Sequence, residues 1–201
     1  MYNYNTVNSN LKRGILKFSE KISKKFSRPV MKFICNMIYG ILASKSCLLS
    51  EIGRNLNEKI PLCKTVTRIS RNLNSFDYGK TLFEEYLKSI KSRCNDESVI
   101  IIDGSDITKP ASNKLEDLCE GCDGSTGKIG IGYHTLGAAV LSDKKLPYGV
   151  YSRIYSSKEK DFTSEDNEII NCFKFFSNQF SKSNIRTMDR GMTVTSITSI
   201  L

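Results

Sequence analysis

The sequence predicts an α/β protein in which a helical N-terminal region precedes a mixed β-sheet. Apolar residues recur at helical spacings of three and four through the first half of the chain, whereas short β-branched and alternating runs dominate the second half. The chain has 201 residues, 39% hydrophobic and 25% charged, which is ordinary for a globular protein. This composition excludes a collagen, a coiled-coil rod and a wholly disordered chain.

Neither a membrane segment nor a disulfide framework is expected. No run reaches the roughly 18 apolar residues that a membrane span needs, and the polar N-terminus lacks the apolar core of a signal peptide. The seven cysteines are odd in number and have no framework spacing. We therefore expect a cytoplasmic protein whose thiols are reduced and mostly buried.

The positive charge is concentrated in the N-terminal half. The net charge is +9, but residues 1–95 carry 18 Lys and Arg against 6 Asp and Glu, whereas residues 96–201 carry 12 against 15. Such an asymmetry is typical of a protein that binds a polyanion with one part and does chemistry with another. A solvated basic surface is the alternative.

Five helices are predicted in residues 1–95, before a polar segment that we take as a domain boundary. Apolar spacing predicts an amphipathic, strongly basic helix that ends near Pro29, because proline cannot continue a helix interior. A buried helix over residues 30–42 follows, and Ser50 is expected to cap a short helix that begins at Glu51. The last two helices are predicted over 62–73 and 81–91.

The helix at 62–73 has an apolar face and an opposite cationic face. Leu62, Val66, Ile69 and Leu73 form the apolar face in this prediction, and Lys64, Arg68 and Arg71 the cationic one. Together with the preceding short helix it fits a helix-turn-helix, although many plain helical bundles share the pattern. The DNA-binding residues expected here are Arg54, Lys64, Arg68 and Arg71.

The second half predicts the order β-β-β-α-β. A continuous β-branched run at 98–103 is typical of a strand covered on both faces, and a long polar loop that includes Cys119 follows it. Strands are expected at 132–141 and 146–155, then a helix capped by Thr163 or Ser164, then a strand at 184–189.

Two aspartates end the first and last of these strands. If the strands are parallel neighbours, Asp103 and Asp189 arrive at the same edge of the sheet, where open α/β sheets place ligands. Carboxylate oxygens without a His/Cys cluster favour Mg²⁺ or Mn²⁺ over zinc. The alternative is that each aspartate only caps a turn.

Several ordered blocks of residues 45–191 resemble one family. The blocks are 102–110 (IDGSDITKP), 115–118 (LEDL), 123–127 (DGSTG), 132–135 (GYHT) and 185–191 (IRTMDRG). They are similar to the blocks of insertion-sequence DDE transposases of the insertion-sequence-four type.

The resemblance implies an RNase H-like catalytic domain preceded by a helical DNA-binding region. It implies cut-and-paste transposition, in which a dimer on double-stranded DNA hydrolyses and transfers phosphodiesters at element ends with two Mg²⁺ or Mn²⁺ ions. Asp103 and Asp189 stand where the family has its first two catalytic, metal-binding aspartates, and Asp106 is the nearest competitor for the first role. Lys109 could meet a phosphate. Such a protein would be cytoplasmic and associated with the nucleoid.

The chain departs from the family after residue 191. The family has a third carboxylate, a glutamate, downstream of the second aspartate, and no glutamate follows Glu168 here. The composition of residues 192–201 differs from what precedes them, and restoring one base after the Gly191 codon allows a family-like continuation. Our hypothesis is an incomplete sheet domain over 96–191, an out-of-frame tail, and an inactive transposase fragment. The alternative is a non-catalytic DNA-binding remnant that occupies element ends.

Two smaller signals favour structural roles. Cys119 and Cys122 form a lone C-x-x-C without a partner pair, so a zinc knuckle is not the expected arrangement. His134, the only histidine, falls within a strand and is expected to be packed and hydrogen-bonded instead of acting as a general base.

Overall fold

A computed structural model describes residues 4–112, 114–124, 126–181 and 184–188. The chain divides into two compact units, Met1–Ser89 and Ile90–Leu201. The division falls a few residues before the boundary expected after residue 95.

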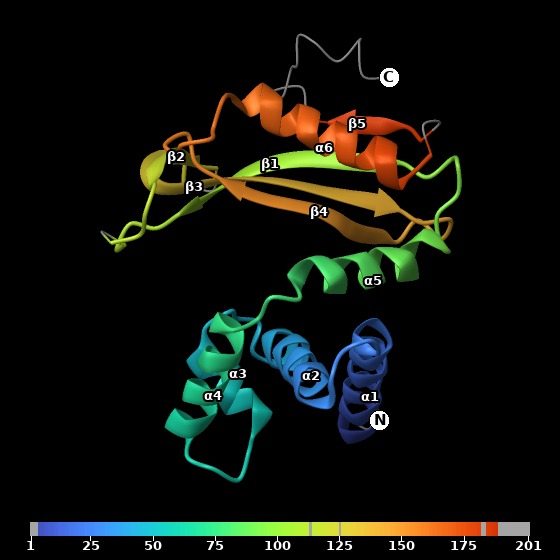
Figure 1. Ribbon diagram of the computed structural model, residues 1–201, viewed down its shortest axis with the longest axis vertical. Helices are drawn as coiled ribbons and strands as arrows, with labels where there is room; N and C mark the ends of the chain where they lie inside the picture. Colours follow the sequence, from blue (N-terminus) through green and yellow to red (C-terminus); the bar gives the residue numbers. More distant parts are fainter. Residues whose placement is uncertain (1–3, 113, 125, 182–183, 189–201) are drawn as a thin grey trace. The chain divides into compact units, whose positions relative to one another are not determined.

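The described part of the first unit is helical (Figure 1). Its helices are α1 (Tyr4–Ser23), α2 (Arg28–Ser44), α3 (Leu49–Leu56), α4 (Leu62–Asn74) and most of α5 (Gly79–Lys91). Pro29 lies in the first turn of α2, so the expectation that it ends the preceding helix is wrong. A proline is tolerated there because the first amides of a helix have no intrahelical acceptor.

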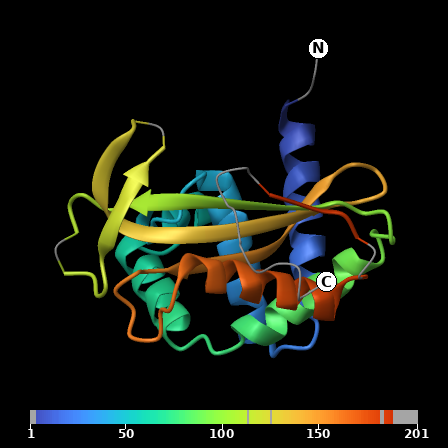
Figure 2. The ribbon, with the colours of Figure 1, turned by 90° about the horizontal axis from the view of Figure 1, so that it is seen from above.

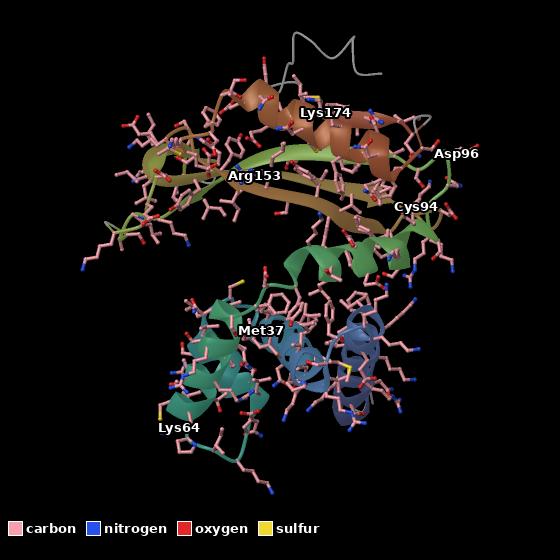
Figure 3. All side chains as sticks on the ribbon, viewed as in Figure 1. Met37, Lys64, Cys94, Asp96, Arg153 and Lys174 are labelled. Atoms are coloured by element: carbon pink, nitrogen blue, oxygen red, sulfur yellow. The ribbon has the colours of Figure 1, made fainter. Side chains whose placement is uncertain are left out.

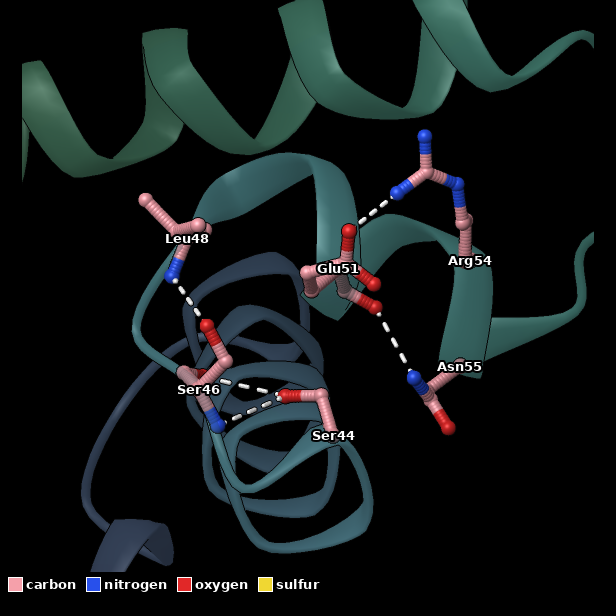
Figure 4. Close-up of polar contacts among 6 residues, drawn as sticks. All are labelled: Ser44, Ser46, Leu48, Glu51, Arg54 and Asn55. Atoms are coloured by element: carbon pink, nitrogen blue, oxygen red, sulfur yellow. Dashed lines mark hydrogen bonds and ion pairs between the residues drawn. The ribbon is translucent and has the colours of Figure 1, made fainter.

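The short connection between α2 and α3 is held by serine hydroxyls. Leu48 caps α3, so the predicted cap at Ser50 is wrong. Ser46 instead accepts a hydrogen bond from the Leu48 amide at 3.1 Å, and the Ser46 amide donates to the Ser44 hydroxyl at 3.2 Å (Figure 4). The connection thus satisfies backbone donors that a helix start leaves free.

The core of the first unit joins α2, α3 and α4. Phe33, Ile52 and Ile69, one from each helix, are 5%, 0% and 0% exposed. Gly40 and Gly53 let these helices approach closely, since a Cβ at residue 40 would lie 2.5 Å from Ile52 Cγ2. The α2–α3 contact therefore depends on Gly40, and the α3–α4 contact on Gly53, where a Cβ would lie 3.0 Å from Leu62 Cδ1.

The described residues of the second unit include a mixed sheet of five strands (Figures 1 and 2). The strands are β1 (Ile100–Thr108), β2 (Cys119–Asp123), β3 (Lys128–Leu141), β4 (Pro147–Tyr155) and β5 (Arg186–Met188). β3 pairs antiparallel with β1, β2 and β4, and β5 pairs parallel with β1. β2 is an added strand where a polar loop was expected.

Helix α6 (Glu165–Gln179) connects β4 to β5 and covers one face of the sheet (Figure 1). Ser164 caps it, accepting a hydrogen bond from the Asn167 amide at 3.1 Å, as one of the two predicted caps. β4 and β5 run parallel, so a crossover helix between them is required. On β1, Ile100 and Ile102 are buried but Ile101 is 39% exposed, so the expectation of a strand covered on both faces is wrong.

Among the described residues, no single helix has both the length and the apolar composition to cross a membrane. α2 and α3 reach that length and apolar composition only when they are taken together, and they are bent by 99° relative to one another.

Candidate functional site

Asp103 lies in the middle of β1 and its side chain is exposed. The prediction that it ends the strand is wrong, because β1 continues to Thr108. Alternation along a strand places Asp103 on the opposite face from its buried neighbour Ile102. Asp103 makes no hydrogen bond or ion pair with another described residue, so its carboxylate oxygens are available to a ligand.

The space beside Asp103 is open because its partner on β3 is a glycine. Asp103 and Gly137 are paired across the antiparallel strands. Directly opposed Cβ atoms in such a pair lie about 4.5–5.5 Å apart, so glycine at residue 137 leaves Asp103 without a neighbouring side chain at this position. A Cβ built on Gly137 meets only the Asp103 carbonyl oxygen, at 3.9 Å.

β1 and β5 are parallel neighbours, which is the arrangement on which the expectation for Asp103 and Asp189 depends. Their register pairs Ile100 with Arg186, Ile101 with Thr187 and Ile102 with Met188. The next residue of β1 is Asp103, and the residue after Met188 in the chain is Asp189. Asp189 itself lies outside the described residues.

Asp106 belongs to a different surface from Asp103. The two residues are three apart on one strand, so their side chains leave from opposite faces. β1 runs through both residues without a turn between them.

The Asp106 carboxylate is held by two strands. Its Oδ1 lies 2.7 Å from His134 Nδ1, and its Oδ2 accepts the Cys122 amide at 2.6 Å. Gly121 leaves room for the Asp106 carboxylate, since a Cβ at residue 121 would lie 2.8 Å from Oδ2. The packed, hydrogen-bonded histidine expected from the sequence is confirmed, but its partner could not be found without the strand register.

These residues line a cleft of about 370 Å³ on the α6 side of the sheet. Its other walls include Tyr155 and, from the first turn of α6, Glu165 and Asp166. Burial, reinforced by the negative charges of Glu165 and nearby carboxylates, raises the pKa of Tyr155 to about 12. Tyr155 therefore stays a neutral hydroxyl near neutral pH.

The C-x-x-C pair does not form a chelating site. Cys119 and Cys122 lie three apart on β2 and leave from opposite faces; Cys119 is 1% exposed, and Cys122 is exposed. Within the described ranges, no three His, Cys, Asp or Glu side chains come together as a metal-binding group. A metal site at Asp103 would need ligands from outside those ranges.

Two of the four cations predicted to bind DNA from the first unit are ion-paired. Arg68 donates to Glu58 Oε2 at 2.6 Å, and Arg54 pairs with Glu51 (Figure 4). Burial would raise the pKa of Glu58, but hydrogen bonds from Arg68 and Thr65 outweigh it and lower that pKa. Arg68 therefore stabilises the turn between α3 and α4.

Lys64 and Arg71 lie exposed on α4, and Figure 3 shows Lys64 on the outside of this helix. Neither side chain makes an ion pair with another described residue. The buried side of α4 is formed by Thr65 and Ile69, whereas Leu62 and Leu73 are 36% and 48% exposed, so the predicted apolar face is shifted. The outward side of α4 is thus polar and cationic.

Lys109 follows β1 in the second unit and is exposed. Its amide donates to the Ile131 carbonyl at 2.7 Å, which fixes the backbone, and its ammonium makes no ion pair or hydrogen bond with a described residue. Its side chain is therefore accessible to an anion.

Compared with protein-family models and with curated proteins, the sequence matches none.

Proposed function

We propose that the chain is a cut-and-paste DNA transposase of the DDE type, whose RNase H-like domain for phosphodiester hydrolysis and transfer lacks the family's third carboxylate and is therefore impaired. The observation that carries the proposal is the parallel pairing of β1 and β5, with Ile102 beside Met188. Each of these residues precedes an aspartate of the family-like blocks. Continuation of this register by one residue would bring Asp103 and Asp189 to one place on the sheet.

The surroundings of Asp103 suit a hard divalent cation such as Mg²⁺ or Mn²⁺. The carboxylate is exposed, unpaired among the described residues and opposite Gly137. Asp103 and Asp189 would hold the ions, and oxygen ligands match the preference of Mg²⁺. Bound ions would activate a water molecule and stabilise the leaving oxygen of the phosphodiester.

The proposal assigns DNA recognition to the α3–α4 pair. α3 is followed by a five-residue connection and then α4, whose outward side carries Lys64 and Arg71. A helix-turn-helix places its second helix in the major groove. Arg68 would contribute through its ion pair with Glu58, by holding the turn, and Lys109 would meet a phosphate near the catalytic domain.

The test is cleavage of a supercoiled plasmid that carries the DNA flanking the gene, with Mg²⁺ present or replaced by EDTA. Any Mg²⁺-dependent nicking that the impaired site supports should fall by at least a hundredfold in Asp103→Asn and in Asp189→Asn. Asp161→Asn, at an exposed aspartate that makes no ion pair or hydrogen bond with a described residue, is the control and should nick like the wild type. Nicking that survives Asp103→Asn would contradict the proposal.

A DNA-binding module without catalysis is the second candidate, and the exposed cations of α4 favour it. It predicts binding to the same flanking DNA that weakens with salt, without cleavage in Mg²⁺ or Mn²⁺. Double substitution of Lys64 and Arg71 by alanine should weaken that binding. Mg²⁺-dependent cleavage would exclude this candidate.

A further inference from the structure

The exposed side of α1 carries a row of cations. Arg13, Lys17 and Lys21 recur every four residues and are exposed, and Lys24 follows in the turn after the helix. At 3.6 residues per turn the three helical positions fall within an arc of about 80°. We call these four residues the α1 cationic face. Lys17, Lys21 and Lys24 make no ion pair with any side chain that the structure describes.

The opposite side of α1 is already buried inside the first unit. Ser19, Ile22 and Ser23 are 0%, 5% and 0% exposed, and α1 packs on α2. The Ser23 hydroxyl donates to the Ser19 carbonyl at 2.6 Å, so even the polar atoms on this side are satisfied within the helix. α1 therefore presents charge outward, and apart from Phe18, which is 39% exposed, the apolar side chains of α1 that the structure describes are buried or half-buried.

This arrangement selects among the polyanions that a cationic helix can bind. An amphipathic helix binds a membrane by inserting its apolar side into the headgroup region. In α1 that side is occupied by protein, whereas phosphate contacts require only exposed cations. From Arg13 to Lys21 the face extends about 12 Å. At one phosphate per 3.4 Å of axis on each strand, this length matches three to four phosphates.

We propose that the α1 cationic face binds the sugar–phosphate backbone of duplex DNA independently of sequence. The inference rests on the proposed function, since it adds a second DNA contact to the one assigned to α4. Phosphate contacts set affinity and position but carry no sequence information, whereas base contacts specify. The first unit would thus combine a surface on α4 that contacts bases with a surface on α1 that contacts phosphates.

The experiment measures binding of the full chain to fluorescent duplexes by anisotropy over a range of salt concentrations. The test variant is the triple substitution Lys17→Gln, Lys21→Gln and Lys24→Gln. We expect the slope of log affinity against log salt to become shallower by about two to three, since each lost phosphate contact removes about 0.9. The affinity should fall by on the order of tenfold or more, equally on flanking DNA and on a random duplex.

Two controls isolate the α1 cationic face. The triple substitution Lys114→Gln, Lys144→Gln and Lys158→Gln removes the same charge from exposed positions of the second unit and should change the slope by less than one. Replacing Lys17, Lys21 and Lys24 by arginine keeps the charge and should keep the wild-type slope.

The outcomes separate this inference from the proposed function. Absence of any duplex binding by the wild type would overturn both. If the double alanine variant of Lys64 and Arg71 weakens binding while the α1 triple variant keeps the wild-type slope, only the inference falls. It also falls if the α1 triple variant loses binding to vesicles of phosphatidylserine and phosphatidylcholine but still binds duplex DNA normally.

Discussion

His134 Nδ1 lies 2.7 Å from Asp106 Oδ1, at positions that are directly paired between β3 and β1. The second oxygen of Asp106 accepts the Cys122 amide of β2, so one carboxylate links three strands. Only 19% of the Asp106 side chain and 16% of the His134 side chain are exposed. The link therefore lies in a partly buried setting, where a lost hydrogen bond is expensive.

Asp106→Ala should lower the free energy of unfolding by about 2 kcal/mol, because it leaves the Cys122 amide and His134 without their acceptor. Asp161→Ala, at an exposed aspartate, should stay within about 0.5 kcal/mol of the wild type. Urea unfolding of the full chain at pH 7, followed by circular dichroism, measures both. Equal stability of the two variants would show that Asp106 does not hold the strands together.

Gly40→Ala and Gly14→Ala should change stability in opposite directions. A Cβ at Gly40 would lie 2.5 Å from Cγ2 of the fully buried Ile52, so crowding of about 1–3 kcal/mol outweighs the better helix propensity of alanine. At Gly14, within α1, nothing lies within 4 Å of the added Cβ, and we expect a gain of about 0.5–1 kcal/mol. Thermal unfolding gives the two signs, and a stabilised Gly40→Ala would refute the close α2–α3 packing.

The ion pair between Glu58 and Arg68 should make stability depend on pH. Its hydrogen bonds lower the pKa of Glu58 in the folded chain, so the folded state binds fewer protons at this residue than the unfolded state. The resulting stabilisation is present at neutral pH and is lost as pH falls below the ordinary glutamate pKa of about 4.3.

The measurement compares the wild type with Glu58→Gln by thermal unfolding at pH 7 and at pH 3. We expect the destabilisation by the substitution to be larger at pH 7. Glu51→Gln, in the more exposed pair with Arg54, should show a smaller difference. A Glu58→Gln effect that is the same at both pH values would contradict the lowered pKa.

The cysteines should divide by accessibility in a thiol-labelling experiment. Cys47, Cys63 and Cys122 are exposed, whereas Cys35, Cys119 and Cys172 are buried. Burial raises the pKa of Cys172 to about 12, which suppresses the reactive thiolate. Iodoacetamide at pH 8 should modify the three exposed thiols first and the three buried ones only in denaturant, as resolved by peptide mass spectrometry. Rapid labelling of Cys172 in the native chain would contradict the packing of α6 on the sheet.

Sequence periodicity predicted the type of almost every described element but not all of their ends. The strands at β1, β3 and β4 and the capped helix α6 follow from local patterns of two or 3.6 residues. β2 was missed because its segment contains glycine and charged residues and is a strand only through its pairing with β3. The start of α3 at Leu49 was missed because its N-cap residue, Leu48, makes no side-chain cap hydrogen bond that a sequence pattern could indicate.

The candidate site, too, could be predicted from the sequence only in part. The two aspartates could be proposed from the sequence, but the parallel pairing of the first and last strands entered only as a condition. The helix α6 connects β4 to β5, and its crossover does not fix which strand β5 pairs with. The faces of the sheet from which the Asp103 and Asp106 side chains leave could not be predicted, since β1 continues past Asp103 instead of ending there. Asp103 is thus exposed opposite Gly137, whereas the Asp106 carboxylate is hydrogen-bonded to His134 and to the Cys122 amide.

The sequence alone determined the basic helical half, the order of the strands other than β2 and the chemistry of the side chains available, because these depend on composition and local period. The tertiary structure alone decided which strands are neighbours, in what register, and which of the cations on α3 and α4 are already paired. The physical reason is that strand pairing and ion pairing join residues distant in the chain, whose approach is set by the packing of the whole unit. Local propensity does not encode this pairing of distant residues.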